Sequence, residues 1–271
     1  MFNITRKTKR KRKSIDAGGI QKQAVYTVGN LCATQGKRGK KQNPTKEAQK
    51  RMNNIYQYEK LEDLLATNFP TAGSAMVFTL TFDDKHLPRR KSRDLERMIV
   101  QAKVKYFLRK LRGLRKAASL PDPVAFWCLE VLTSVEERWH VHLVLDSTGK
   151  DIDMVRSAWI YGKQIEADPL RVDSTKNWET LAKYMTKESR ERQDSDSQPG
   201  LHAWSNTRNI ARPIIETEWV DDDCDIVIPD GTIVMQDEKV KNEFGSWHFV
   251  KYRYPSSEAD RALVGRSPST A

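Results

Sequence analysis

Two histidines separated by one residue are the side chains in this chain best suited to bind a metal ion. They lie in the segment Arg138–Leu145, where strand alternation places His140 and His142 on one face and Val141 and Leu143 on the other. Two imidazoles side by side on a strand can bind one divalent ion. A His-x-His pair alone is a weak signal, so the prediction depends on the segments around it.

A carboxylate can complete the set of ligands from the preceding segment. Residues 126–130 form a strand-like run, and the polar residues 133–137 predict a hairpin connection to the histidine strand. If Glu130 pairs with His140, antiparallel parity places Cys128 opposite His142 on the same face. Two imidazoles and one carboxylate suit Mn²⁺ or Mg²⁺ and leave positions open for substrate oxygens. The alternatives are an ordinary amphipathic hairpin, and Cys128 as a small buried filler.

A tyrosine and a lysine follow on a predicted helix. Tyr184 and Lys187 are three residues apart and therefore share a helix face, while Trp178, Leu181 and Met185 recur at apolar helical spacing. A phenol with a pKa near 10 is a poor nucleophile at neutral pH, so its attack on a phosphodiester needs a base or a polarised phosphorus. A bound metal ion would polarise the phosphorus, and Lys187 would add a second positive charge.

In this order, these motifs resemble a known family. The segments Phe78-Thr79-Leu80-Thr81-Phe82, Glu130 with Trp139-His140-Val141-His142, and Tyr184-Met185-Thr186-Lys187 resemble the HUH endonucleases that initiate rolling-circle replication. The resemblance is closest to the initiators of small bacterial plasmids and filamentous phages, and it runs from about residue 43 to residue 213. Further matches are Asn68-Phe69, Trp159 with Gly162, and Gly200-Leu201-His202-Ala203-Trp204-Ser205. Relaxases of the superfamily usually carry the tyrosine ahead of the histidines, whereas here it follows.

The resemblance implies a reaction and its partners. The protein would nick single-stranded origin DNA through a 5′-phosphotyrosine link, and the free 3′ hydroxyl would prime synthesis. No Gly-x-x-x-x-Gly-Lys-Ser/Thr motif occurs, so we expect a separate host helicase as well as a host polymerase. The alternatives are a transposase or relaxase of the same superfamily, and a noncatalytic single-strand-binding module. The sequence leaves the oligomeric state open.

Termination would need a second activated group. Some phage initiators of the superfamily carry two tyrosines four residues apart, and Glu188 occupies the second position here. We hypothesise a water activated by Glu188 or Glu179, or a second subunit that supplies its own Tyr184. The alternative for both glutamates is a solvated helix face with ion-pair partners.

Charge and composition favour a soluble protein that binds nucleic acid. The 271 residues carry a net charge of +11, and sixteen lysines and arginines lie within the first 60 residues against three acidic ones. The core of this basic arm is Arg10-Lys11-Arg12-Lys13, which we expect to contact DNA phosphates. A solubilising tail or a nuclear localisation signal would have the same composition. With no membrane-length apolar run, no signal peptide and three scattered cysteines, the sequence predicts a bacterial cytoplasmic protein.

The breaks in pattern predict four regions. Residues 1–45 would be a disordered basic arm, 46–215 the endonuclease domain, 216–256 a β-rich appendage with a hairpin at 226–234, and 257–271 a disordered tail. The expected fold class is α+β, with a central antiparallel sheet and helices on one face, as in ferredoxin-like and RNA-recognition domains. Trp204 and Arg208 could stack on or clamp DNA, and a structural role is equally compatible with the sequence. His202 is predicted to be structural.

Overall fold

The chain has an α+β structure made of two compact units. The computed structural model describes residues 9–28, 47–90, 92–132, 138–147, 149–172, 177–187, 203–242 and 245–255. One unit, called here the site unit, spans Lys50–Ala211; the other, the terminal unit, combines Met1–Gln49 with Arg212–Ala271. Each contains one five-stranded antiparallel sheet. The predicted α+β class is therefore confirmed.

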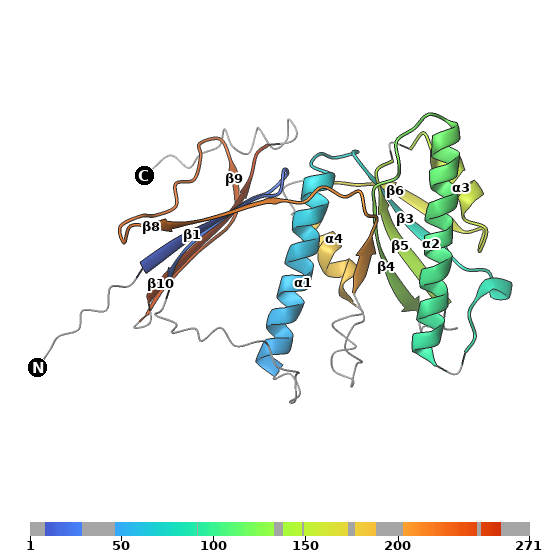
Figure 1. Ribbon diagram of the computed structural model, residues 1–271, viewed down its shortest axis with the longest axis horizontal. Helices are drawn as coiled ribbons and strands as arrows, with labels where there is room; N and C mark the ends of the chain where they lie inside the picture. The colour runs from blue at the N-terminus through green and yellow to red at the C-terminus, as the bar shows by residue number, and fades with distance from the viewer. Residues whose placement is uncertain are drawn as a thin grey trace, which may run out of the picture. The chain divides into compact units, whose positions relative to one another are not determined.

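The sheet of the site unit has the strand order β6-β3-β5-β4-β7. The elements are α1 (Glu47–Asn68), β3 (Met76–Thr81), the short 3-10 helix η1 (Asp84–His86), α2 (Arg93–Ala117), β4 (Ala125–Leu132), β5 (Arg138–Leu145), α3 (Ile152–Ala158), β6 (Ile165–Pro169), α4 (Asn177–Met185) and β7 (Trp204–Asn206). From β3 to β6 they follow the βαββαβ order. The short strand β7 extends the sheet at the edge of β4 (Figure 1).

One face of this sheet carries the main hydrophobic core. Val141 and Leu143 of β5 both point to this face, because alternate residues of a strand point to the same side. Both side chains are fully buried. Helix α2 places Val104 and Phe107, at helical spacing, against the same cluster, and α3 adds Val155. Figure 1 shows α2 and α3 along this side of the sheet. The predicted layer of helices on one face is therefore present.

Helices also lie on the opposite face of this sheet. The ring of Phe69, just after α1, meets Phe126 of β4 edge to face, with centroids 5.9 Å apart. The indole of Trp178 in α4 donates a hydrogen bond to the carbonyl of Phe69, at 3.2 Å. Phe126 and Val144 are buried on this face, so part of it is apolar and needs a cover. Helices α1 and α4 therefore add a second layer, on the face of the sheet opposite to the predicted one.

The terminal unit corrects the predicted domain boundaries. Its strands are β1 (Lys9–Asp16), β2 (Gln21–Val28), β8 (Ile214–Val220), β9 (Ile233–Asn242) and β10 (Gly245–Arg253), in the order β8-β1-β2-β10-β9. The basic segment is thus an inner strand, whereas we expected a disordered arm at 1–45 and a separate appendage at 216–256. Strand β8 places acidic residues beside β1, and Arg12 pairs with Glu218 at 3.2 Å. Residues 29–45 and the predicted tail at 257–271 lie outside the described residues.

A covering segment closes one face of the terminal sheet. Residues 221–232 connect β8 to β9, and Ile226 packs with Val25, Val250 and Tyr252 in a small core. The hairpin expected at 226–234 is therefore not formed. Ile226 packs in the core and is not part of a strand. Strand β9, which begins at Ile233, pairs with β10 and not with residues 226–228.

None of the helices in the described ranges is both long and apolar enough to cross a membrane.

Candidate active site

The register of the central hairpin confirms the predicted arrangement of the polar side chains. Glu130 on β4 lies directly opposite His140 on β5, and Cys128 lies opposite His142. All four side chains therefore share the face of the sheet that α4 approaches. The connecting residues 133–137 lie outside the described part of the chain.

Helix α4 brings Tyr184 to this face. Its hydroxyl donates a hydrogen bond to Glu130 Oε2 at 2.9 Å and lies 2.9 Å from His142 Nε2. The third side of this triangle is a 2.6 Å contact between His142 Nε2 and Glu130 Oε2. The ring of Tyr184 meets the imidazole edge to face, with centroids 4.9 Å apart. The tyrosine residue is 42% exposed, so part of its side chain lies at the surface.

Lys187 lies beside the same group. It lines a small pocket with Glu130, His142 and Tyr184, as expected from its position three residues after the tyrosine. Its charge is one of the interactions that favour an ionised Glu130. The structure therefore gathers a phenol, a carboxylate, an imidazole and a cation from β4, β5, the end of α4 and the residues just after it.

Electrostatics favour a charged carboxylate and a neutral imidazole. Burial raises the pKa of Glu130, but hydrogen bonds from His142 and Tyr184 outweigh it, so that pKa lies below its ordinary value. Burial and the neighbouring His142 lower the pKa of His140, against the attraction of Glu130. At neutral pH Glu130 is ionised and His140 is uncharged, which are the forms that bind metal ions.

The donor chemistry fits a hard divalent ion such as Mn²⁺ or Mg²⁺, although the ligands are not spread around a common centre. Within the described ranges no group of three or more His, Cys, Asp or Glu side chains is arranged as a preformed metal cluster. Glu130 Oε2 and His142 Nε2 are 2.6 Å apart, whereas neighbouring ligands of an octahedral ion are about 3 Å apart. Binding an ion between them would replace this contact with two metal bonds.

Two threonines of β3 orient the imidazoles, and sequence reasoning missed them. Thr79 and Thr81 lie opposite His142 and His140, and each hydroxyl is 3.4 Å from the Nδ1 of its partner. When Nδ1 donates its hydrogen to the threonine hydroxyl, Nε2 is unprotonated and faces a ligand, which is the tautomer that a bound metal ion requires. The signal was present in the sequence, since Thr79-x-Thr81 has the same alternation as His140-x-His142.

If His142 is a ligand of Mn²⁺, replacing Thr79 with valine is expected to weaken Mn²⁺ binding by about tenfold, because the imidazole loses the partner that orients it. Valine keeps the shape of threonine, so the sheet should be preserved. Isothermal titration with Mn²⁺ measures the change. Thr217→Val, at an exposed position of β8, is the matched control. An affinity equal to that of the control would show that Thr79 does not orient the histidine.

The end of β3 is held in place by two residues that the resemblance had singled out. The indole of Trp159 donates a hydrogen bond to the carbonyl of Thr81 at 3.0 Å. A Cβ at Gly162 would lie 2.0 Å from the same carbonyl oxygen, so only glycine allows this close approach. Both residues therefore fix the strand end that carries Thr81 beside His140.

The other predicted residues of this unit are placed as follows. Trp204 lies on β7 opposite Cys128 and lines a cleft of about 510 Å³ with Lys60 and Lys105. Arg208 is exposed in the turn after β7. Glu179 accepts a hydrogen bond from Lys183 at 2.7 Å, which is the ion pair that we gave as its alternative. Glu188 and His202 lie outside the described residues.

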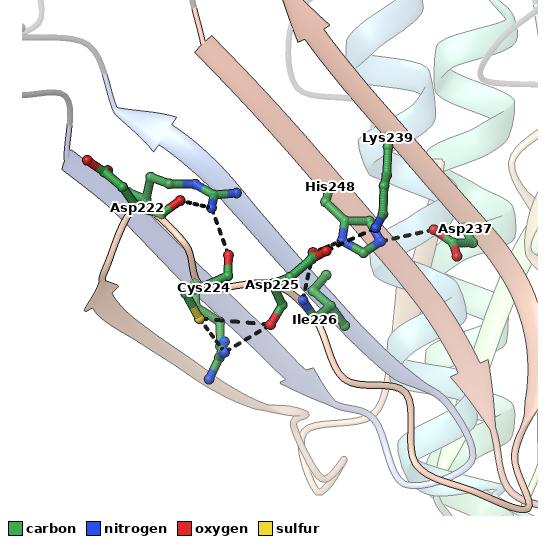
Figure 2. A network of polar contacts seen from close by, with 9 residues as sticks. Asp222, Cys224, Asp225, Ile226, Asp237, Lys239 and His248 are labelled. Atoms are coloured by element: carbon green, nitrogen blue, oxygen red, sulfur yellow. Dashed lines mark hydrogen bonds and ion pairs between the residues drawn. The ribbon is translucent and has the colours of Figure 1, made fainter.

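The basic core of the N-terminal segment divides between two faces of β1. Arg10 donates hydrogen bonds to the carbonyls of Asp222 and Cys224, at 2.8 and 2.7 Å, and Arg12 approaches Cys224 Sγ at 2.7 Å. The two arginines therefore hold the covering segment, whose residues Asp222 and Cys224 are drawn in Figure 2. Lys11 and Lys13 point to the opposite face, because alternate strand residues do.

No family model, no curated protein and no solved structure matches this chain. An accessible phenol between a carboxylate and an imidazole, with a lysine nearby, can attack an electrophile that carries negative charge. A phosphodiester is such an electrophile.

Proposed function

We propose that this protein is a metal-dependent single-stranded DNA endonuclease and strand transferase that initiates rolling-circle replication. The observation that carries this proposal is the position of the Tyr184 hydroxyl, 2.9 Å from both Glu130 Oε2 and His142 Nε2. Sequence alone placed the tyrosine on a helix beyond the hairpin, and the fold brings it onto the polar face. A noncatalytic binding module would have no need for this convergence.

In the proposed reaction, Tyr184 attacks the scissile phosphate. The bond between the tyrosine oxygen and phosphorus forms as the bond from phosphorus to the 3′ oxygen breaks. The phenol donates its hydrogen toward Glu130, and the carboxylate has two oxygens, so one oxygen can accept the proton during the attack while the other binds the ion. The products are a 5′-phosphotyrosine link and a 3′ end that gains a proton to become a free hydroxyl. The link conserves the energy of the broken bond, so strands can be rejoined.

The remaining residues of the site bind and orient the substrate. Glu130, His140 and His142 would hold the Mn²⁺ or Mg²⁺ ion, which when bound would polarise the scissile phosphate. Lys187, beside Tyr184, would pair with a phosphate oxygen. Trp204 and Arg208 would contact the flanking DNA. The host would supply the helicase and the polymerase in a bacterial cytoplasm.

The proposal is tested by trapping the covalent intermediate. The full chain is incubated with Mn²⁺ and a pool of single-stranded DNA from its own replicon, and adducts are mapped by intact mass and peptide sequencing. We expect an adduct on Tyr184 that is absent after chelation or in Tyr184→Phe. Tyr106→Phe is the matched control, because Tyr106 is 44% exposed and lies on α2. Specific retention of DNA without any adduct would contradict the proposal and favour a binding module.

A further inference from the structure

A row of aromatic and basic side chains crosses one face of the terminal sheet. The register aligns Trp219 of β8 with Lys11 of β1, Lys11 with Tyr26 of β2, and Tyr26 with Trp247 of β10. These four side chains point to the same face, because directly opposed residues of antiparallel strands do. Adjacent strands are about 4.8 Å apart, so the strands that carry Trp219 and Tyr26 on either side of Lys11 are about 10 Å from each other.

The neighbouring positions on this face continue the pattern. Lys9 and Lys11 place their ammonium groups 5.7 and 4.3 Å from the centroid of the Trp219 ring. Trp247 and Phe249 lie two residues apart on β10, with parallel rings whose centroids are 5.7 Å apart. Lys13 lines a shallow pocket of about 480 Å³ with Tyr26 and Trp247. The lysines of β1 therefore lie between a ring on β8 and the rings on β2 and β10.

The rings of this face remain accessible. Trp219 is 57% exposed, and Tyr26, Trp247 and Phe249 are only partly buried. Toward the other end of the same face Lys22 and Lys251 are buried, so the accessible surface ends there. We call the accessible part, formed by Lys9, Lys11, Lys13, Tyr26, Trp219, Trp247 and Phe249, the aromatic face.

The opposite face of the sheet supplies the core of the terminal unit. Residues 221–232 cover it, and hydrogen bonds from Lys239 and His248 hold the pKa of Asp225 below its ordinary value. His248 is buried between the carboxylates of Asp225 and Asp237 (Figure 2). The arginines of β1 also point to this covered side. The unit thus gains its apolar and ionic contacts on one face and leaves exposed rings on the other.

We propose that the aromatic face binds single-stranded DNA. Unpaired bases would stack on Trp219, Tyr26 and Trp247, and the three lysines of β1 would pair with backbone phosphates. A face of this kind suits a single strand, because bases in a duplex are already stacked on one another. The choice of DNA as the nucleic acid rests on the proposed function, and the surface would hold DNA separately from the Tyr184 site.

Binding is measured with full-length protein carrying Tyr184→Phe, so that covalent capture cannot contribute. Fluorescence anisotropy follows a labelled single-stranded oligonucleotide of mixed sequence. We expect Trp219→Ala to weaken binding by about tenfold and Trp219→Phe to retain most of it, because phenylalanine still offers a ring for stacking. Lys11→Glu should weaken binding and reduce the dependence of log affinity on log salt by about one unit.

Lys241→Glu is the matched control for charge. Lys241 lies on β9 but points to the covered face, since it pairs with Ser246 beside His248. The inference would be overturned if Trp219→Ala and Lys11→Glu left binding unchanged. It would also be overturned if Lys241→Glu weakened binding as much as they do. Sedimentation of the free protein provides a second check. A shift from dimer to monomer caused by Trp219→Ala would show that the face binds a second copy of the chain, and would also overturn it.

The two proposals can fail separately. If the protein with Tyr184 forms no adduct but Trp219→Ala weakens DNA binding, DNA binding by the aromatic face is supported and the nicking reaction is contradicted. If the adduct forms and Trp219→Ala leaves binding unchanged, the nicking reaction is supported and DNA binding by the aromatic face is contradicted.

Discussion

Replacing His142 with alanine is expected to lower the rate of the proposed strand cleavage by at least about a hundredfold. One imidazole contributes to every part of the site: its Nε2 lies 2.6 Å from Glu130 and 2.9 Å from the Tyr184 hydroxyl, and it is a proposed metal ligand. Its loss removes a metal donor and a partner that positions the nucleophile. Adduct formation under single-turnover conditions, at rising Mn²⁺ concentrations, measures the effect.

Cys128 provides the control for this experiment. It lies opposite His142 on the neighbouring strand and is buried on the same face, so Cys128→Ala disturbs the same part of the sheet. We expect this variant to retain its Mn²⁺ dependence and most of its cleavage rate. If both variants lost activity equally, the effect would come from packing rather than from the imidazole. If His142→Ala cleaved at the normal rate, the proposed metal site would be wrong.

The arrangement on the central hairpin could be predicted from sequence because it depends on local geometry. Strands β4 and β5 are neighbours, and once Glu130 is paired with His140 the alternation of a strand decides which other side chains share their face. The spacing of Tyr184 and Lys187 is likewise a property of a single helical turn. The contact of Tyr184 with Glu130 and His142 depends on how α4 packs on the sheet, and no local pattern specifies that.

The terminal unit was missed because its sheet joins segments about 200 residues apart. Composition suggested a disordered arm, since Lys9–Lys13 are consecutive cations, yet a strand sends such residues alternately to two faces. The arginines of β1 form an ion pair with an acidic residue of β8 and donate hydrogen bonds to carbonyls of the covering segment. Neither partner is near β1 in the chain. Only the fold shows that the basic segment is paired on both sides.

The largest effect on stability is expected at Arg115, whose side chain is only 3% exposed. Its guanidinium contacts Asp146 at 2.7 Å and Asp151 at 2.5 Å, and so joins the end of α2 to both ends of the connection between β5 and α3. Replacing Arg115 with leucine leaves two carboxylates without their cation. Removing one partner of a buried ion pair costs about 3–5 kcal/mol in the free energy of unfolding.

The loss should depend on pH. Burial raises the pKa of Asp146 above its ordinary value even though Arg115 opposes the shift, and without the arginine that pKa rises further. A raised pKa in the folded state means that stability is fully present below the ordinary pKa of the carboxyl and is lost as pH rises through the folded value. The difference in stability between Arg115→Leu and the parent protein should therefore be smaller in mildly acidic solution than at neutral pH.

Arg112→Leu is the matched control, because Arg112 lies one turn earlier on α2. It forms an ion pair with Asp122 at 3.3 Å, but the two side chains are 54% and 56% exposed. An exposed pair contributes about 0–1 kcal/mol, so urea denaturation of this variant should almost coincide with that of the parent protein. The same substitution on one helix then separates the effect of burial from that of charge. If Arg115→Leu were no less stable than Arg112→Leu, the buried pairs would not hold the end of α2 to the connection between β5 and α3.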